Sequence, residues 1–71
     1  MAVLLEWRGR GVGGALLTEL IHIAREHGFI EVMLNAQVQA IGFYARHGFV
    51  VGGEEFLDAG IPHRSMRRAL L

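Results

Sequence analysis

Residues 6–20 read EWRGRGVGGALLTEL and place a cluster of glycines directly before an apolar helical pattern. Glycine is a poor helix former, and none of the usual capping residues (Ser, Thr, Asp or Asn) precedes this helix. Without side chains, the amide N–H groups at a helix start are open to an anion, which the positive end of the helix dipole also attracts. The stretch therefore favours an anion site over a purely structural turn. The candidate residues of this site are Arg8, Gly9, Arg10, Gly11, Val12, Gly13 and Gly14.

The hydrophobic pattern of the whole chain predicts alternating strands and helices. The strands are expected at residues 2–7, 29–34, 49–51 and 63–70, and the helices at residues 13–27 and 39–47, with a turn-rich segment at 52–62. A His-Gly pair ends each helix, where glycine is a preferred left-handed cap. The order β-α-β-α-β-β predicts an α/β fold with a mixed sheet, whose first strands are parallel and joined by right-handed crossovers.

The first helix carries the strongest periodic signal. Val12, Leu16, Leu20 and the pair Ile23/Ala24 recur at helical spacing and form the expected core stripe. Leu17 and Ile21 widen this stripe. The helix is therefore expected to pack this apolar face against the sheet.

The composition describes one small domain of 71 residues, 52% of them hydrophobic, with no cysteine and a net charge of zero. A domain this short cannot bury so much apolar surface alone, so we expect a homo-oligomer or a complementing half, with the strand at residues 2–7 as an open edge. The neutral charge argues against nucleic-acid binding, and the lack of a long apolar run argues against a membrane span. No metal site is expected, since the histidines lack ligand spacing. These features favour a cytoplasmic protein.

Two phosphate-binding patterns compete for the glycine stretch. Residues 9–14 satisfy G-x-G-x-x-G, the dinucleotide fingerprint, between a strand and a helix. That fingerprint requires an acidic residue after the next strand, where this chain has Asn35. The second pattern, R/Q-x-x-G-x-G/A, is matched by residues 8–13, and a further block, F-Y-x-x-x-G-F, is matched by residues 43–49.

These two blocks resemble the GNAT superfamily of N-acetyltransferases, and the tail EEFLDAGIPHRSMRR resembles its ElaA/YjcF-like bacterial branch. The resemblance covers nearly the whole chain but only the C-terminal half of the family fold. It implies direct transfer of an acetyl group from acetyl-CoA to a small-molecule or peptide amine. Residues 1–71 are therefore expected to form a single partial GNAT domain, the half that binds acetyl-CoA.

The resemblance also implies where acetyl-CoA lies. Residues 8–14 would cradle its pyrophosphate, with Arg8 as the charged clamp. The pantetheine arm would pair with the backbone of Val3, Leu4 and Leu5, where neighbouring strands splay. Further candidate contacts with CoA are Asn35, Gln37, Phe43 and Tyr44. For Asn35 and Gln37 a turn-forming role is the open alternative.

The resemblance gives Tyr44 the role of general acid that protonates the departing thiolate, the alternative being a half-buried helix tyrosine. The general base stays open among solvent, Glu6, Glu54, Glu55 and His63. The remaining basic side chains are expected at the surface. Those at helix ends or on helix faces are His22, His27 and His47, and those on a solvated strand face are Arg64, Arg67 and Arg68.

Two functions besides catalysis are consistent with the sequence. The chain is a CoA-binding module without turnover if an acceptor site is missing. It is a dimerising fragment without a ligand if the glycines form only a turn. Binding of CoA separates the second of these from the others, and thiol release in the presence of amines separates the enzyme from the module.

Overall fold

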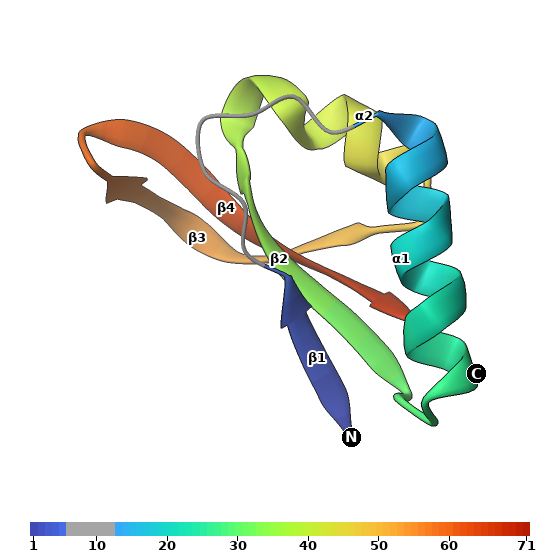
Figure 1. Cartoon of the computed structure of the whole chain (residues 1–71). Helices are drawn as coiled ribbons and strands as arrows, with labels where there is room; N and C mark the ends of the chain where they lie inside the picture. Colours follow the sequence, from blue (N-terminus) through green and yellow to red (C-terminus); the bar gives the residue numbers. More distant parts are fainter. Residues whose placement is uncertain (6–12) are drawn as a thin grey trace.

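A computed structural model describes residues 1–5 and 13–71 of the chain. These residues form four strands, two α-helices and one short 3₁₀ helix, and Figure 1 shows how the labelled strands and α-helices are arranged. Their bounds are β1 Ala2–Leu5, α1 Gly14–Glu26, β2 Glu31–Gln37, η1 Val38–Ala40, α2 Ile41–Ala45, β3 Val50–Asp58 and β4 Ile61–Ala69. The predicted order of strands and helices is confirmed.

The four strands form one mixed sheet in the order β1-β2-β4-β3. β1 and β2 are parallel and joined through α1, with Ala2 opposite Glu31 and Leu5 opposite Leu34. β4 pairs antiparallel with both β2 and β3. The predicted mixed sheet with parallel first strands is therefore confirmed, and β1 is an edge strand of the described sheet.

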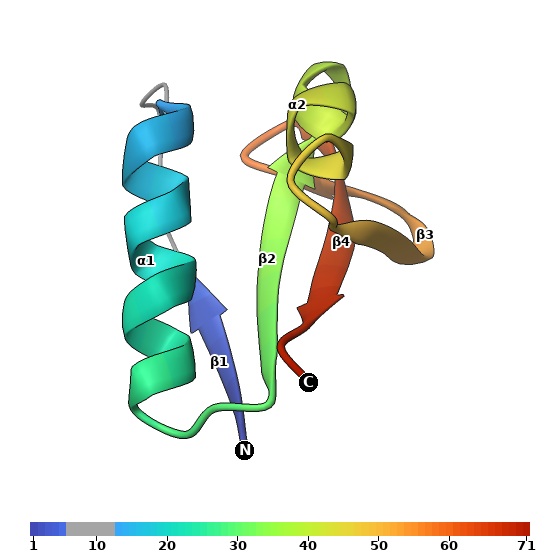
Figure 2. The same ribbon diagram turned by 90° about the vertical axis from the view of Figure 1, so that its right-hand side faces the viewer.

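Helices α1 and α2 cover the same face of this sheet, as the two views in Figures 1 and 2 show. Every second side chain of a strand points toward these helices, because successive side chains of a strand point to opposite faces of the sheet. The buried core residues are Leu17, Ile21, Ala24, Val32, Leu34, Ala36, Tyr44, Phe49, Met66 and Leu70. The core thus lies between the helices and one face of β2 and β4.

The buried side of α1 is only one part of the predicted apolar stripe. Leu17, Ile21 and Ala24 are buried, whereas Leu16 is 53% exposed and Ile23 is 41% exposed. The apolar residues of this helix cover more than one face, so periodicity alone did not select the face that packs on the sheet. The exposed pair leaves an apolar strip on the outer side of α1.

The uncovered face of the sheet carries a continuous row of residues across all four strands. Leu4, Met33, Arg67 and Val50 are neighbours in register along this row. Leu4 is 51% exposed and Val50 is 65% exposed, so both ends of the row are largely uncovered by the described residues. This face, called the open face below, is where a small domain with excess apolar composition leaves surface unburied.

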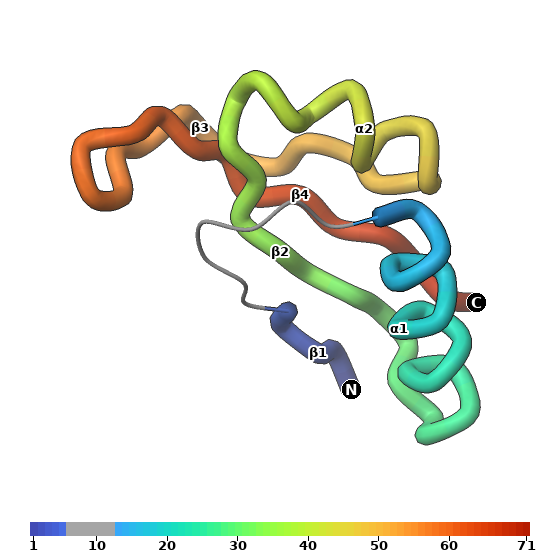
Figure 3. Tube along the Cα trace, turned by 45° about the horizontal axis from the view of Figure 1, so that its top comes forward, coloured from blue at the N-terminus to red at the C-terminus, as the bar shows by residue number. Residues whose placement is uncertain are grey.

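The segment predicted as turn-rich, residues 52–62, is mostly strand. β3 and β4 form a hairpin whose turn consists of Ala59 and Gly60, both with positive φ. Two central residues with positive φ are typical of the tight turns that match the twist of a hairpin. The register shifts between Gly52 and Phe56, so the glycines there mark an irregular strand rather than a loop. Figure 3 shows the hairpin turn far from the C-terminal end of α1.

Two further boundaries differ from the sequence prediction. β2 continues to Gln37, so Asn35 and Gln37 lie in a strand and not in a connecting turn. The second predicted helix is divided into η1 and α2. No helix within the described residues is long and apolar enough to span a membrane.

Candidate functional site

The two sequence blocks of the predicted site meet in space where α1 begins. Gly13 is the N-cap of α1, has extended backbone angles and makes no side-chain capping hydrogen bond. Gly14 is the first helical residue, and a Cβ placed on it would lie 3.3 Å from Cε1 of His47. The helix start therefore packs directly against the segment that follows α2. Predicted residues of the glycine stretch and of the F-Y-x-x-x-G-F block thus belong to one region.

Tyr44 is anchored in this region by aromatic packing. It is only 6% exposed, and its ring makes edge contacts with Phe43 at 5.1 Å and with Phe49 at 5.9 Å between centroids. Phe43 also lies 4.9 Å from the His47 ring. The short α2 helix places successive aromatic side chains so that a buried Tyr44 is fixed in orientation. A tyrosine ring held in one orientation suits a group that donates a proton to a defined atom.

Part of the predicted site lies outside the described residues. These predictions concern Glu6, Arg8, Gly9, Arg10, Gly11 and Val12. For the same glycine stretch, the structure describes only Gly13 and Gly14.

The predicted pantetheine residues form the described part of β1. Val3 and Leu5 pack against the core, while Leu4 points to the open face. All three pair in register with β2 up to Leu5 opposite Leu34. The strands are therefore not splayed over Ala2–Leu5, contrary to the expected slot at these residues. Asn35 to Gln37 continue β2 past this paired part.

The structure brings Asn35, Gln37 and His63 together on the open face. In the β2–β4 register Asn35 lies opposite Ser65, and Gln37 lies opposite His63. Gln39 donates a hydrogen bond of 2.9 Å to the side-chain oxygen of Gln37. This polar group lies at the carboxyl end of β2, the end of a parallel strand at which α/β sheets bind ligands.

The candidate bases are not gathered around Tyr44. His63 stacks on Phe56 with centroids 5.9 Å apart, and its Nδ1 lies 2.7 Å from the carbonyl oxygen of Ile61. Glu54 and Glu55 are exposed within the register shift of β3. Tyr44 belongs to the helix-covered face, whereas His63 belongs to the open face. A reacting centre that used both Tyr44 and His63 would therefore have to reach both faces of the sheet at its end.

The basic residues of β4 do not share one solvated face, so that prediction is wrong. Arg67 lies on the open face, 4.0 Å from the carboxylate of Glu31. Arg64 and Arg68 alternate with it along β4. Their side chains therefore lie on the helix-covered face, the face on which Met66 is buried. Arg64 donates a 2.6 Å hydrogen bond to the carbonyl oxygen of Gly53, and its Nε is buried without a partner among the described residues.

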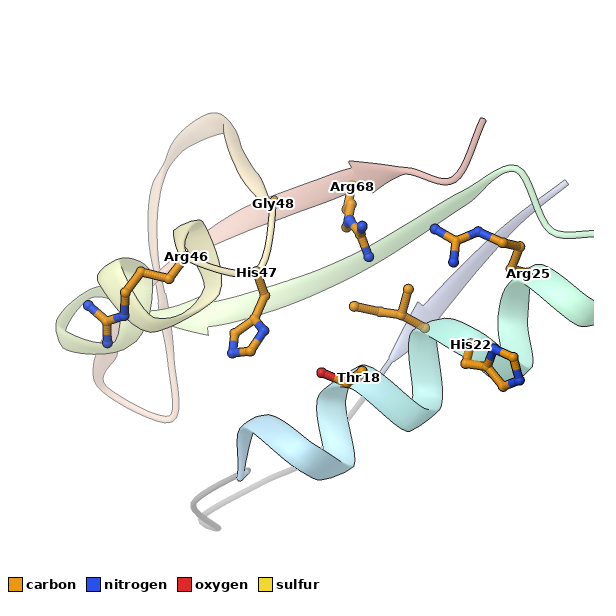
Figure 4. A pocket seen from close by; sticks show the side chains of 8 residues that line it. Thr18, His22, Arg25, Arg46, His47, Gly48 and Arg68 are labelled. Atoms are coloured by element: carbon orange, nitrogen blue, oxygen red, sulfur yellow. The ribbon is translucent and has the colours of Figure 1, made fainter.

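A cationic pocket lies between α1 and the segment after α2, and the sequence did not reveal it. Its lining residues are Thr18, Ile21, His22, Arg25, Arg46, His47, Gly48 and Arg68 (Figure 4). These residues come from three distant segments, so no local motif links them. The one signal in the sequence is the alternation of side chains along β4, which places Arg68 on the same face as the apolar Met66, toward the helices.

Comparison with known proteins identifies the family. The family described as "Acetyltransferase (GNAT) domain" matches residues 1–70. The chain belongs to the GNAT acetyltransferase family. It is similar to "Uncharacterized N-acetyltransferase YjcF" of Bacillus subtilis (strain 168), with 45% identity over 69 residues that cover 96% of this chain and 49% of that protein.

Solved structures show the same relationship for this GNAT chain. It resembles an acyl-CoA N-acyltransferase from Pseudomonas aeruginosa with a TM-score of 0.77 and 38% identity, over 87% of this chain and 42% of that one. It resembles Escherichia coli ElaA with a TM-score of 0.72 and 32% identity, over the same shares of the two chains. The resemblance inferred from the sequence is confirmed. The chain spans about half the length of the curated relatives it matches.

Within residues 1–5 and 13–71, no three His, Asp or Glu side chains are grouped so that they could hold a metal ion.

Proposed function

We propose that this GNAT chain is the acetyl-CoA-binding half of an N-acetyltransferase that transfers the acetyl group directly to an amine. The observation that supports this most strongly is the contact between Gly14 and His47, because it unites the glycine stretch with the aromatic block around Tyr44. An uncapped glycine at the start of α1 leaves amide N–H groups for a pyrophosphate. Residues 8–14 supply these amides, and Arg8 and Arg10 add charge-assisted contacts.

In the proposed reaction the amine nitrogen attacks the thioester carbonyl carbon. The carbonyl oxygen gains negative charge, which a backbone N–H near residues 3–5 stabilises. The C–S bond then breaks, and Tyr44 protonates the thiolate as it leaves. A base removes the proton from the amine nitrogen, so the products are an amide and free CoA. His63, Glu55 and a water molecule are the candidates for this base.

We further propose that a second polypeptide surface covers the open face. Leu4 and Val50 leave apolar side chains exposed there, and β1 lies at an edge of the described sheet. The relatives contain about as much chain again beyond the matched region. The covering surface is therefore either a complementing N-terminal half or a second copy of this chain. A cytoplasmic location stays a prediction.

A CoA-binding module without turnover is the second candidate function. Tyr44 lies on the helix-covered face of the sheet and the candidate base His63 lies on the open face, and this separation favours the module. The two functions share the binding step and differ in chemistry. Titration with CoA tests the shared binding step. Release of free thiol from acetyl-CoA in the presence of a panel of amines tests the chemistry. Saturable binding without thiol release identifies the module.

A further inference from the structure

The cationic pocket defined above has a volume of about 460 Å³. Arg25 of α1 and Arg68 of β4 point toward each other from opposite walls of the space, and His47 points into it from the segment after α2 (Figure 4). The hydroxyl of Thr18 faces the His47 ring. Arg46 and His22 lie at the rim and point outward. The inner lining therefore presents two guanidinium groups, an imidazole and a hydroxyl.

No carboxylate is among the described residues that line this pocket. Glu26 lies nearby in the sequence, but its carboxylate is 2.6 Å from Nε2 of His22 at the rim. Guanidinium groups stay charged at any physiological pH, so Arg25 and Arg68 bring like charges together. Arg68 is half-buried, and burial of a charge is unfavourable unless an anion compensates it. The missing countercharge among the lining residues points to a ligand that carries it.

The side chain of Arg68 is positioned by its strand and by the backbone of Gly48. It is half-buried, two residues from the buried Met66 on the same strand. Its side chain packs against the backbone of Gly48, where a Cβ would lie 2.8 Å from Nε. Gly48 also has a φ of +87°, which favours glycine. A side chain at residue 48 would therefore occupy the space of Arg68. Glycine at this position keeps that space open.

We propose that this pocket binds a phosphate monoester. A planar guanidinium donates paired hydrogen bonds to phosphate oxygens, and Thr18 and His47 supply further donors. The pocket shares no residue with the glycine stretch at 8–14, so it is a second anion site and stands apart from the pyrophosphate function. The phosphate belongs either to the 3′-phosphate of CoA or to a separate phosphorylated ligand.

The test uses the full chain, titrated with inorganic phosphate and followed by NMR of the arginine Nε–H and backbone amide signals. Saturable shifts centred on residues 18, 25, 47, 48 and 68 are expected. Arg68→Gln should weaken phosphate binding at least about tenfold, because a charge-assisted hydrogen bond is lost. Arg67→Gln is the matched control: it removes the same charge from the next residue, on the open face, and should leave binding unchanged. Equal weakening by both variants, or shifts spread over the surface, would overturn the proposal.

A second variant protects the test against misfolding. Arg25 is exposed on α1, so Arg25→Gln leaves the core intact and should weaken phosphate binding as Arg68→Gln does. Circular dichroism reports whether each variant is folded. A folded Arg25→Gln variant that binds phosphate like the parent chain contradicts the proposal.

Competition then assigns the source of the phosphate. If CoA displaces the bound phosphate and dephospho-CoA does not, the pocket takes the 3′-phosphate of CoA. If neither displaces it, the pocket takes a separate ligand; both results support a phosphate site. The phosphate titration does not depend on CoA binding, so its failure is distinguishable from failure of the proposed acetyltransferase function.

Discussion

The first residue of α1 rests on the segment that follows α2: a Cβ on Gly14 would lie 3.3 Å from Cε1 and 3.4 Å from Nε2 of His47. This contact joins two sequence blocks that are far apart in the chain. It also places the uncapped helix start beside the aromatic cluster of Tyr44, Phe43 and Phe49. Both proposed anion sites border on this junction, the glycine stretch before α1 and the cationic pocket behind His47.

Gly13→Ser tests whether the open helix start serves a ligand. Serine is a better N-cap than glycine by a few tenths of a kcal/mol, so thermal unfolding should show equal or slightly higher stability. The serine hydroxyl would occupy an amide N–H that the pyrophosphate needs, so CoA affinity should fall about tenfold. Calorimetric titration with CoA measures this loss. Unchanged affinity in the stable variant would remove Gly13 from the site.

Tyr44→Phe separates catalysis from packing. The ring contacts with Phe43 and Phe49 remain, so the variant should fold and bind CoA with nearly parental affinity. Loss of a general acid lowers rates about a hundredfold or more, and thiol release from acetyl-CoA should fall by that factor. Release at the parental rate would show that Tyr44 is a packing residue and leave another group as the acid.

Leu17→Ala tests the observed core against the predicted stripe. Leu17 is fully buried, so its truncation should cost about 2–5 kcal/mol in the free energy of unfolding, measured by urea denaturation. Leu16→Ala is the matched control on the neighbouring helix position. Leu16 is exposed, so the same truncation should change stability by less than about 1 kcal/mol. A larger loss from Leu16→Ala would mean that another surface covers the outer side of α1.

Leu4→Lys combined with Val50→Lys tests the covered open face. Leu4 and Val50 lie at the two ends of the row that crosses the open face of the sheet. Lysine charges at these positions should oppose association of this face with a second copy of the chain. Sedimentation should show the parent chain heavier than its 7.9 kDa protomer and the double variant closer to it. A parent chain that is monomeric and well folded would exclude self-association and leave a complementing half as the partner.

Local patterns in the sequence predicted the parallel first strands and the helix that joins them, and the family resemblance linked the two motif blocks. They worked because glycine caps and helical periodicity are local signals. The two strands of the last hairpin were predicted, but the extension of β3 over residues 52–58 was missed, because its glycines mark a register shift that only pairing with β4 reveals. For Asn35 and Gln37 the sequence left a turn open as the alternative, because the pairing partners that extend β2 are distant in sequence.

The cationic pocket shows the same limit for the site. Arg25, His47 and Arg68 are separated along the chain and meet only because α1 and β4 flank the segment after α2. Their residue types indicated surface charge, and only their convergence without a lining carboxylate indicates a ligand. For the aromatic block, by contrast, neighbours in sequence are also neighbours in space, since Phe43 contacts Tyr44.

The most direct test of the central proposal is calorimetric titration of the chain with CoA and with NAD. We predict saturable binding of CoA and none of NAD, with the CoA affinity reduced about tenfold or more by Arg8→Ala and unchanged by Arg67→Ala, because Arg67 lies on the open face. No binding of CoA at millimolar concentration by the folded chain, or preferential binding of NAD, would contradict it.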